Sequence, residues 1–199
     1  MKSISFLGLI LLMLAAVPAA CAPAAAPAAD EPTASVVLPP TATLPPTVVP
    51  LSFVPAVYKA QAEGLALDYP ADWTATPISQ VGSRGSQGQL LSPGTTAESL
   101  PKGGTRVGIT VNLWDPKNDL AAYVTHRRSA WDASGSKIVK ESSGDLTDGR
   151  KYMSFVVQGP DGFQTFFLFT GLGEKYLEIS GEGNLALVEE IAHTVRPLK

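Results

Sequence analysis

The stretch "GLALDYPADWTATP", residues 64–77, indicates how the folded part of this chain begins. Residues 65–68 alternate leucine with alanine or aspartate, which is the period of a half-buried β-strand. Pro70 presets the φ angle that the second position of a β-turn requires, and Asp72 is also a common turn residue. We therefore expect a β-hairpin with its corner at "YPADW", and we expect Trp73 to begin the returning strand and to pack over the hairpin.

The same two-residue period continues in "TRVGITVNLW", residues 105–114. Valine, isoleucine and leucine occupy the odd positions from 107 to 113, whereas Trp114 shares the opposite face with Thr110 and Asn112. This pattern predicts a strand that is buried on one face.

Residues 151–180 predict three successive antiparallel strands, separated by the turn-forming stretches "GPDG" (159–162) and "GLGEK" (171–175). The middle strand carries apolar residues on both faces between Phe163 and Phe169. A strand that is apolar on both faces is typical of a central position covered from both sides.

Two segments have helical spacing instead. Residues 119–134 repeat apolar side chains at helical intervals, with Asn118 or Asp119 as the N-cap. Residues 184–197 do the same, with Asn184 as the cap and Pro197 as the end of the helix. His193 and Arg196 would then lie at the negative end of that helix dipole.

Taken in order, these pieces resemble the PsbP-like family over about Glu63 to Lys199. The resemblance rests on the order and spacing of five stretches: "GLALDYPADW", the strand 105–114, the helix 119–132, "GDLTDGRKYMSFVV" and the closing "HTVRPLK". It implies an α+β fold in which an antiparallel sheet lies between helices, an α/β/α sandwich. It also implies proteins that bind partner proteins or assist assembly, without an invariant active site.

The N-terminus resembles a bacterial lipoprotein signal. An apolar run over residues 4–17 has about the length of a signal-peptide core and is shorter than the roughly 20 residues that span a bilayer. It ends in "VPAAC" (17–21), where small residues precede Cys21 as in a lipobox. Because Cys21 is the only cysteine, no internal disulfide competes for its thiol. We expect a signal peptide over residues 1–20 and lipid attachment at Cys21.

Two alternatives stay open at this end. Pro18 departs from the lipobox pattern, and "ACA" (20–22) could be an ordinary cleavage site that removes Cys21, although Pro23 opposes cleavage there. An uncleaved anchor is the other alternative. Lipidation would hold the chain stably at a membrane, since each buried CH₂ contributes about 0.8 kcal/mol.

We expect residues 21–52 to form the lipidated N-terminus and a linker, and residues 53–199 to form one domain that resembles the PsbP-like family. Eight prolines between residues 22 and 50 favour an extended, disordered stalk. The domain carries 14 basic and 16 acidic side chains with no long basic run, so its composition does not predict nucleic-acid binding.

Catalytic and metal-binding motifs are not evident in the sequence. His126 and His193 do not form an H-x-x-x-H or H-E-x-x-H pattern, and no G-x-S-x-G nucleophile motif occurs. "GSRGSQG" (82–88) lacks the ending of a phosphate-binding loop and is expected to be a connection. We therefore expect no enzyme activity, no cofactor and no metal site.

The remaining candidate is a protein-binding surface made by Trp114, Arg127 and Arg128, because aromatic residues and arginines are enriched at interaction hot spots. The alternative is that Trp114 packs beneath the helix 119–132, as Trp131 would.

Together these features predict a lipid-anchored, non-enzymatic binding module on the extracytoplasmic face of a bacterial membrane, acting as an accessory or assembly factor for a protein partner. The second hypothesis is a small-ligand carrier or sensor with a pocket between sheet and helix.

Overall fold

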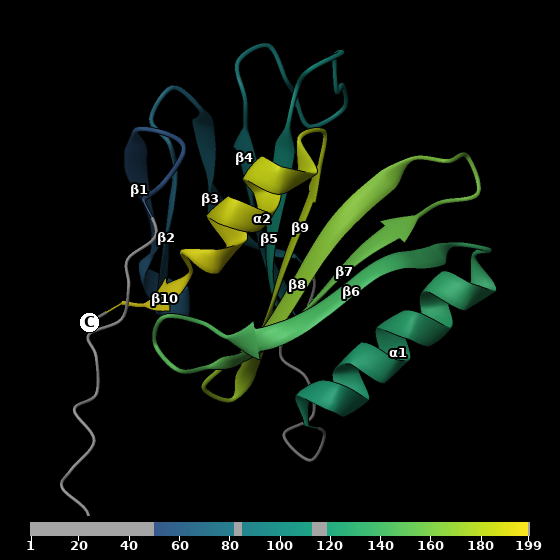
Figure 1. Cartoon of the computed structure of the whole chain (residues 1–199). Coiled ribbons are helices and arrows are strands. Elements are labelled where there is room, and N and C mark those ends of the chain that lie inside the picture. The colour runs from purple at the N-terminus through teal and green to yellow at the C-terminus, as the bar shows by residue number, and fades with distance from the viewer. Residues whose placement is uncertain (1–49, 82–84, 113–118, 199) are drawn as a thin grey trace, which may run out of the picture. The chain divides into compact units, whose positions relative to one another are not determined.

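The computed structural model describes residues 50–81, 85–112 and 119–198 (Figure 1). Within these ranges the elements follow in the order β1 (Pro55–Ala60), the 3₁₀ turn η1 (Gln61–Glu63), β2 (Leu65–Pro70), β3 (Thr74–Val81), β4 (Gly85–Leu91), β5 (Arg106–Asn112), α1 (Leu120–Ala133), β6 (Lys137–Asp145), β7 (Lys151–Gln158), β8 (Gln164–Leu172), β9 (Lys175–Glu182), α2 (Leu185–His193) and β10 (Arg196–Pro197). None of the described helices is long and apolar enough to cross a membrane.

The strands form two sheets. The larger has seven strands in the order β3-β4-β5-β9-β8-β7-β6, and the smaller has three in the order β1-β2-β10. All pairings within both sheets are antiparallel. The expected α+β fold with an antiparallel sheet between helices is confirmed.

The two helices cover opposite faces of the seven-stranded sheet (Figure 1). Val188 and Ile191 of α2 pack with the residues of β5 and β9 that point to one side, among them Ile109 and Ile179. On the other side, α1 packs against β7 and β8. The aromatic core there consists of Tyr123, Trp131, Phe155, Phe167 and Phe169.

The middle strand of the predicted three is β8, and it is covered on both faces as expected. Phe166 and Leu168 are buried on the α2 side, whereas Phe169 is buried on the α1 side. Phe163, which the pattern included in this strand, precedes β8 in the turn and is 45% exposed.

The expected hairpin at "YPADW" is wrong, although the turn is present. The Trp73 amide donates to the Pro70 carbonyl at 3.0 Å, which closes the turn. However, β2 pairs with β1 and β10, whereas β3 pairs with β4. The turn therefore connects two different sheets. Trp73 is partly buried and packs against the core on the α2 side of the sheet rather than capping a hairpin.

Both helix N-caps agree with the sequence, but the second helix is shorter than expected. Asp119 accepts the Ala122 amide, and Asn184 accepts the Leu187 amide. The second helix ends at His193, not Pro197. Because the buried Val195 directs the chain into the core, the following residues extend and pair with β2 as β10.

The prediction that Arg196 lies at the end of this helix is therefore wrong. Its guanidinium donates to the Asp68 carboxylate of β2 at 2.7 Å. Of the Gly-rich stretch 82–88, residues 85–88 belong to β4 rather than to a connection. Gly88 is required there, because a Cβ would lie 2.5 Å from the Tyr58 hydroxyl.

Candidate functional site

The two predicted arginines of α1 reach opposite flanks of the helix. The Arg127 guanidinium donates to Glu178 of β9 at 3.0 Å, and it lies 5.7 Å from the ring centroid of Phe167 on β8. Arg128 donates instead to Glu141 of β6 and lies 4.8 Å from the Phe155 ring of β7. The two guanidinium groups therefore have different ion-pair partners, on β9 and on β6, while the two rings that they lie over, Phe167 and Phe155, are paired across β8 and β7. Trp114, the third predicted residue, lies outside the described residues, as does the lipid-attachment residue Cys21.

Arg127 belongs to a buried polar network between α1 and the sheet. The Asn112 amide donates to the Tyr123 hydroxyl at 2.8 Å, and that hydroxyl donates to Glu178 at 3.1 Å. The Tyr123 ring stacks on Tyr176 with centroids 5.3 Å apart. Tyr123 and Arg127 of α1 thus hold the Glu178 carboxylate directly, and Asn112 of β5 holds the Tyr123 hydroxyl.

Burial is the largest cause of the pKa shifts in this network. Burial raises the pKa of Glu178, while Arg127 and the Tyr123 hydroxyl oppose that rise. Burial and the neighbouring Glu178 charge also raise the pKa of Tyr123. Within the described residues, the Arg127 Nε is buried without a hydrogen-bond partner. The pKa of Tyr123 and that of Glu178 are therefore both shifted upwards.

Beside the network, the α1 face of the sheet becomes polar and half-exposed. The side chains that share this face on β4, β5 and β9 are Gln87, Gln89, Gly108, Thr110 and Ser180. Gln87 is exposed and the other four are half-buried. On the same strands, the residues that point to the α2 side are almost all buried. We call these five residues the polar half-face.

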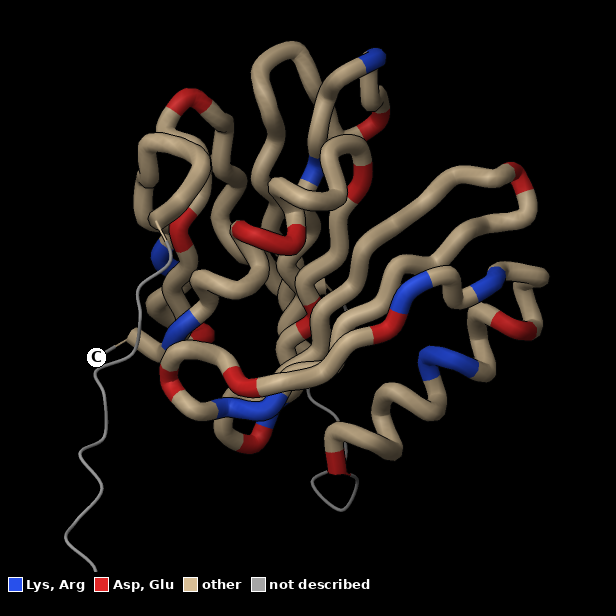
Figure 2. The backbone as a smooth tube through the Cα atoms, in the orientation of Figure 1, with Lys and Arg blue, Asp and Glu red and all other residues tan. Residues whose placement is uncertain are grey.

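None of the five residues of the polar half-face is charged. Figure 2 shows Lys and Arg interspersed with Asp and Glu over the domain. At the end of the polar half-face away from α1, Arg106 donates to Glu182 at 2.6 Å. The polar half-face is therefore rich in hydrogen-bonding groups, and the charged side chains at its borders, Arg106 and Arg127, are paired with Glu182 and Glu178.

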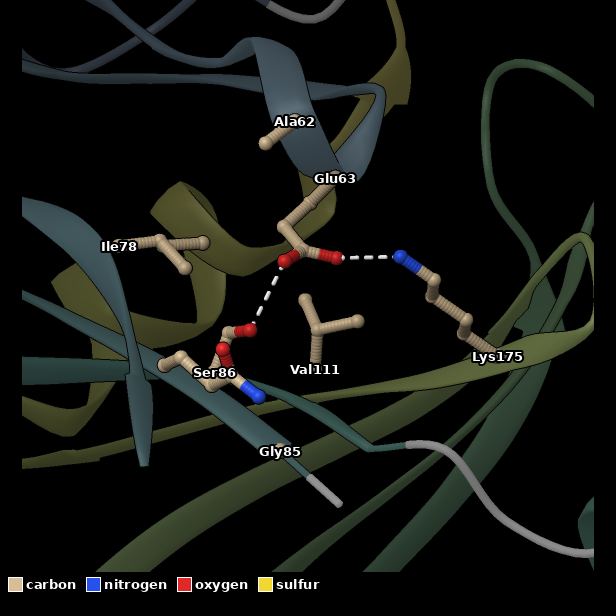
Figure 3. A pocket seen from close by; sticks show the side chains of 8 residues that line it. Ala62, Glu63, Ile78, Gly85, Ser86, Val111 and Lys175 are labelled. Carbon is tan, nitrogen blue, oxygen red and sulfur yellow. Dashed lines mark hydrogen bonds and ion pairs between the residues drawn. The ribbon is translucent and has the colours of Figure 1, made fainter. Parts of the chain in front are cut away.

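A separate cavity of 340 Å³ lies on the α2 side of the sheet, beneath η1. Figure 3 shows the Glu63 carboxylate between the Ser86 hydroxyl and the Lys175 ammonium. Lys175 donates to Glu63 at 2.6 Å and Ser86 donates at 2.8 Å. The Lys175 hydrogen bond lowers the pKa of Glu63, despite its burial. Ile78 and Val111 supply apolar walls.

No local sequence pattern predicts that Glu63, Ser86 and Lys175 meet, because they belong to η1, β4 and β9, three elements that are separated along the chain. Glu178 had a weak signal: it is a charge within the apolar strand "KYLEIS". The two histidines lie on α1 and α2 as predicted. Burial lowers the pKa of His193, which lies against Tyr152. Among the described residues, no group of three or more His, Cys, Asp and Glu side chains could hold a metal.

Comparison with solved structures supports the fold. The chain is similar to the solution structure of cyanobacterial PsbP (CyanoP) from Synechocystis sp. PCC 6803, with a TM-score of 0.54 and 13% identity, over 72% of this chain and 92% of that one. It also matches the Saccharomyces cerevisiae Ran-binding protein Mog1p (TM-score 0.49, 12% identity, 74% of this chain and 97% of that one). A further match is the protein of unknown function PA94 from Pseudomonas aeruginosa (TM-score 0.42, 14% identity, 68% and 86%).

No protein-family model and no curated protein matches the sequence. The first of the three structural comparisons establishes the PsbP-like fold of the domain. A likeness at this level of identity defines the fold and leaves the function to the residues of the site.

Proposed function

We propose that this chain is a non-enzymatic binding module that contacts a protein partner, tethered by lipid at Cys21 to the extracytoplasmic face of a bacterial membrane. It would act as an accessory or assembly factor of a membrane complex. The PsbP-like fold is compatible with such a module. The lipobox-like sequence before Cys21 and the proline-rich stalk support the tether.

The observation that carries the proposal is the contrast between the two sides of β4, β5 and β9. Their α2 side is a buried apolar core except at the cavity beneath η1, whereas the polar half-face on the α1 side stays half-exposed within the described residues. Gly108 and the short side chains of Thr110 and Ser180 leave a shallow surface whose hydroxyl groups can both donate and accept hydrogen bonds.

The chemistry of this surface indicates what its partner would present. Arg127 borders the polar half-face through its contact with Glu178 on β9, next to Thr110 in the strand register. Aromatic contacts hold its guanidinium in place, so its loss of side-chain freedom on binding would be small. We therefore expect a protein surface rich in carboxamide, hydroxyl and carboxylate groups. Arg128 and Trp114 remain candidates for additional contacts.

In-cell cross-linking of the full chain, followed by affinity capture and mass spectrometry, tests the proposal. Gln87→Arg places a long charged side chain on the polar half-face at an exposed position, so the fold should be retained. Ala186→Arg makes the same change at an exposed position on α2, on the opposite face of the sheet. We expect one protein to be captured by the wild type and by Ala186→Arg, and lost with Gln87→Arg. Capture of that protein by all three chains would contradict the assigned surface.

The tether is tested separately by Cys21→Ala. Lipid attachment needs the thiol, so the wild type should sediment with membranes and carry incorporated fatty acid, whereas the variant should do neither. A variant that stays in the membrane fraction would support the uncleaved-anchor alternative instead.

A further inference from the structure

The cavity beneath η1 contains an arrangement that the proposed function does not use. Its Glu63 carboxylate is only 11% exposed, and both carboxylate oxygens are occupied, one by the Ser86 hydroxyl and one by the Lys175 ammonium. Lys175 is 32% exposed, so the ammonium lies nearer to solvent than the carboxylate does. A pair of opposite charges therefore lies at one end of a cavity of 340 Å³, a volume in the range of small-molecule sites.

From this geometry we propose that the cavity binds a small zwitterion, a molecule that carries one ammonium and one carboxylate group, as an α-amino acid does. The ligand ammonium would bind Glu63, and the ligand carboxylate would bind Lys175 and the Ser86 hydroxyl. The ligand replaces one internal ion pair with two, so no buried charge is left without a partner.

Charge balance selects this class over simple ions. A cation bound at Glu63 would lie beside the Lys175 ammonium, and an anion bound at Lys175 would lie beside the Glu63 carboxylate. In each case one like charge is repelled in a partly desolvated site, where charges interact more strongly than in water. Among charged ligands that break the Glu63–Lys175 pair, only a molecule with both charges satisfies both residues.

The side chains that line the cavity indicate the chemistry of the uncharged part of the ligand. Ala62, Ile78 and Val111 line the cavity with apolar side chains, and Ser86 lies directly opposite Val111 in the register of β4 and β5. An aliphatic side chain of moderate size, such as that of leucine, fits these walls.

This site is independent of the proposed protein contact. Val111, Ser86 and Lys175 point to the α2 side of the sheet, whereas the polar half-face lies on the α1 side. Failure of one proposal would therefore leave the other intact.

The test is a titration of the folded chain with L-leucine. The amide resonances of the cavity residues are monitored in NMR spectra during the titration. Leucinamide, which has only the ammonium, and 4-methylpentanoate, which has only the carboxylate, are the matched ligands. We expect leucine to shift the amides of Ser86 and Lys175, and each matched ligand to bind weaker by at least about tenfold, since a hydrogen bond to a charged group is lost. Equal binding of the three compounds, or no shift with leucine, would overturn the proposal.

Three cavity variants and one control variant separate ligand binding from a purely structural ion pair. Glu63→Gln and Lys175→Met each remove one charge and should reduce leucine binding by at least about tenfold. Lys151→Met removes the ammonium of an exposed ion pair with Asp145 and should bind leucine like the wild type. Ser86→Ala keeps the ion pair and provides a mild variant if the others unfold, and it should also weaken binding. Unchanged leucine binding in the folded cavity variants would contradict the site.

Discussion

The two faces of β5 and β9 differ sharply although the same two strands build them. On the α2 face, Val107, Ile109 and Ile179 are fully buried in an apolar core. On the α1 face, Gly108, Thr110 and Ser180 alternate with those residues and stay half-exposed. At these positions of β5 and β9, one face therefore belongs to the core, and the other keeps polar groups within reach of solvent.

The difference arises because the two helices cover the sheet to different extents. α2 packs over the centre of the sheet, whereas α1 packs over β7 and β8 and reaches β9 mainly through polar contacts of Tyr123 and Arg127. A surface left half-exposed beside a well-packed helix is where we locate the partner contact.

The largest expected effect is on the buried face. Ile179→Ala should lower the free energy of unfolding by about 2–5 kcal/mol, because it leaves a cavity in the core. Thr110→Ala, on the neighbouring strand but on the α1 face, should cost less than about 1 kcal/mol. Urea denaturation of both variants measures the difference. Equal losses would show that the polar half-face is as tightly packed as the core.

Two glycines sharpen the comparison at nearly the same place in the sheet. A Cβ on Gly181 would lie 2.4 Å from Val188 of α2 and 2.9 Å from the Arg106 carbonyl, so Gly181→Ala should destabilise the fold by about 1–3 kcal/mol. A Cβ on Gly108 would meet only Ser180, with its hydroxyl at 3.0 Å. Because that side chain can rotate, Gly108→Ala should change stability by less than about 1 kcal/mol. Thermal unfolding distinguishes the two, and a reversed order would contradict the assigned faces.

Substitution of Arg127 tests the polar network that links α1 to Glu178 of β9. Arg127→Met keeps the apolar stem and removes the partner of Glu178, so we expect a loss of about 1–3 kcal/mol at neutral pH. Without Arg127 the pKa of Glu178 rises further above its unfolded value. Folding then favours the protonated form, so the variant should lose stability as the pH rises through the folded pKa, and its deficit should shrink in acid.

The matched control is Arg128→Met, whose partner Glu141 is 45% exposed. Removing that pair should cost less than about 1 kcal/mol at any pH. Denaturation curves at several pH values measure both variants. A pH-independent loss in Arg127→Met would show that the Glu178 charge is not what the arginine stabilises.

The smallest expected effect concerns His193 at the end of α2. Burial lowers its pKa from 6.5, while the Glu189 charge opposes and the Lys140 charge reinforces this shift. Because the unfolded chain binds the proton more readily, stability should fall as the pH drops below about 6.5, by at most about 1.4 kcal/mol per pH unit. In His193→Gln this slope should disappear from the urea-denaturation series, and a slope that persists would assign it to another group.

Much of the fold could be predicted because it depends on local periodicity. The alternation in β5, the doubly apolar β8 and the caps Asp119 and Asn184 all have short-range signals. The prediction that was wrong, the hairpin at Pro70, depends on pairing between strands that are far apart in the sequence. The turn at Pro70 was correctly located, but no local pattern reveals that β2 pairs with β10, some 130 residues later in the chain, rather than with β3.

The candidate sites follow the same rule. Arg127 could be selected by residue type, but its contact with Glu178 depends on how α1 lies across the sheet. The polar half-face was partly visible as Thr110 and Asn112 opposite the apolar positions of β5, although its continuation onto β4 and β9 requires the strand order. The cavity with Glu63 and Lys175 had no sequence signal, because a 3₁₀ turn and a strand end meet there only after both sheets assemble.

The central claim is that the polar half-face binds a protein partner, and the most direct measurement is the affinity of the captured partner for three purified chains. We predict that the wild type and Ala186→Arg bind it equally, and that Gln87→Arg binds it weaker by more than about tenfold, as expected for a charge buried in an interface. Equal affinity of all three chains, or a loss confined to Ala186→Arg, would contradict the claim and move the contact to another surface.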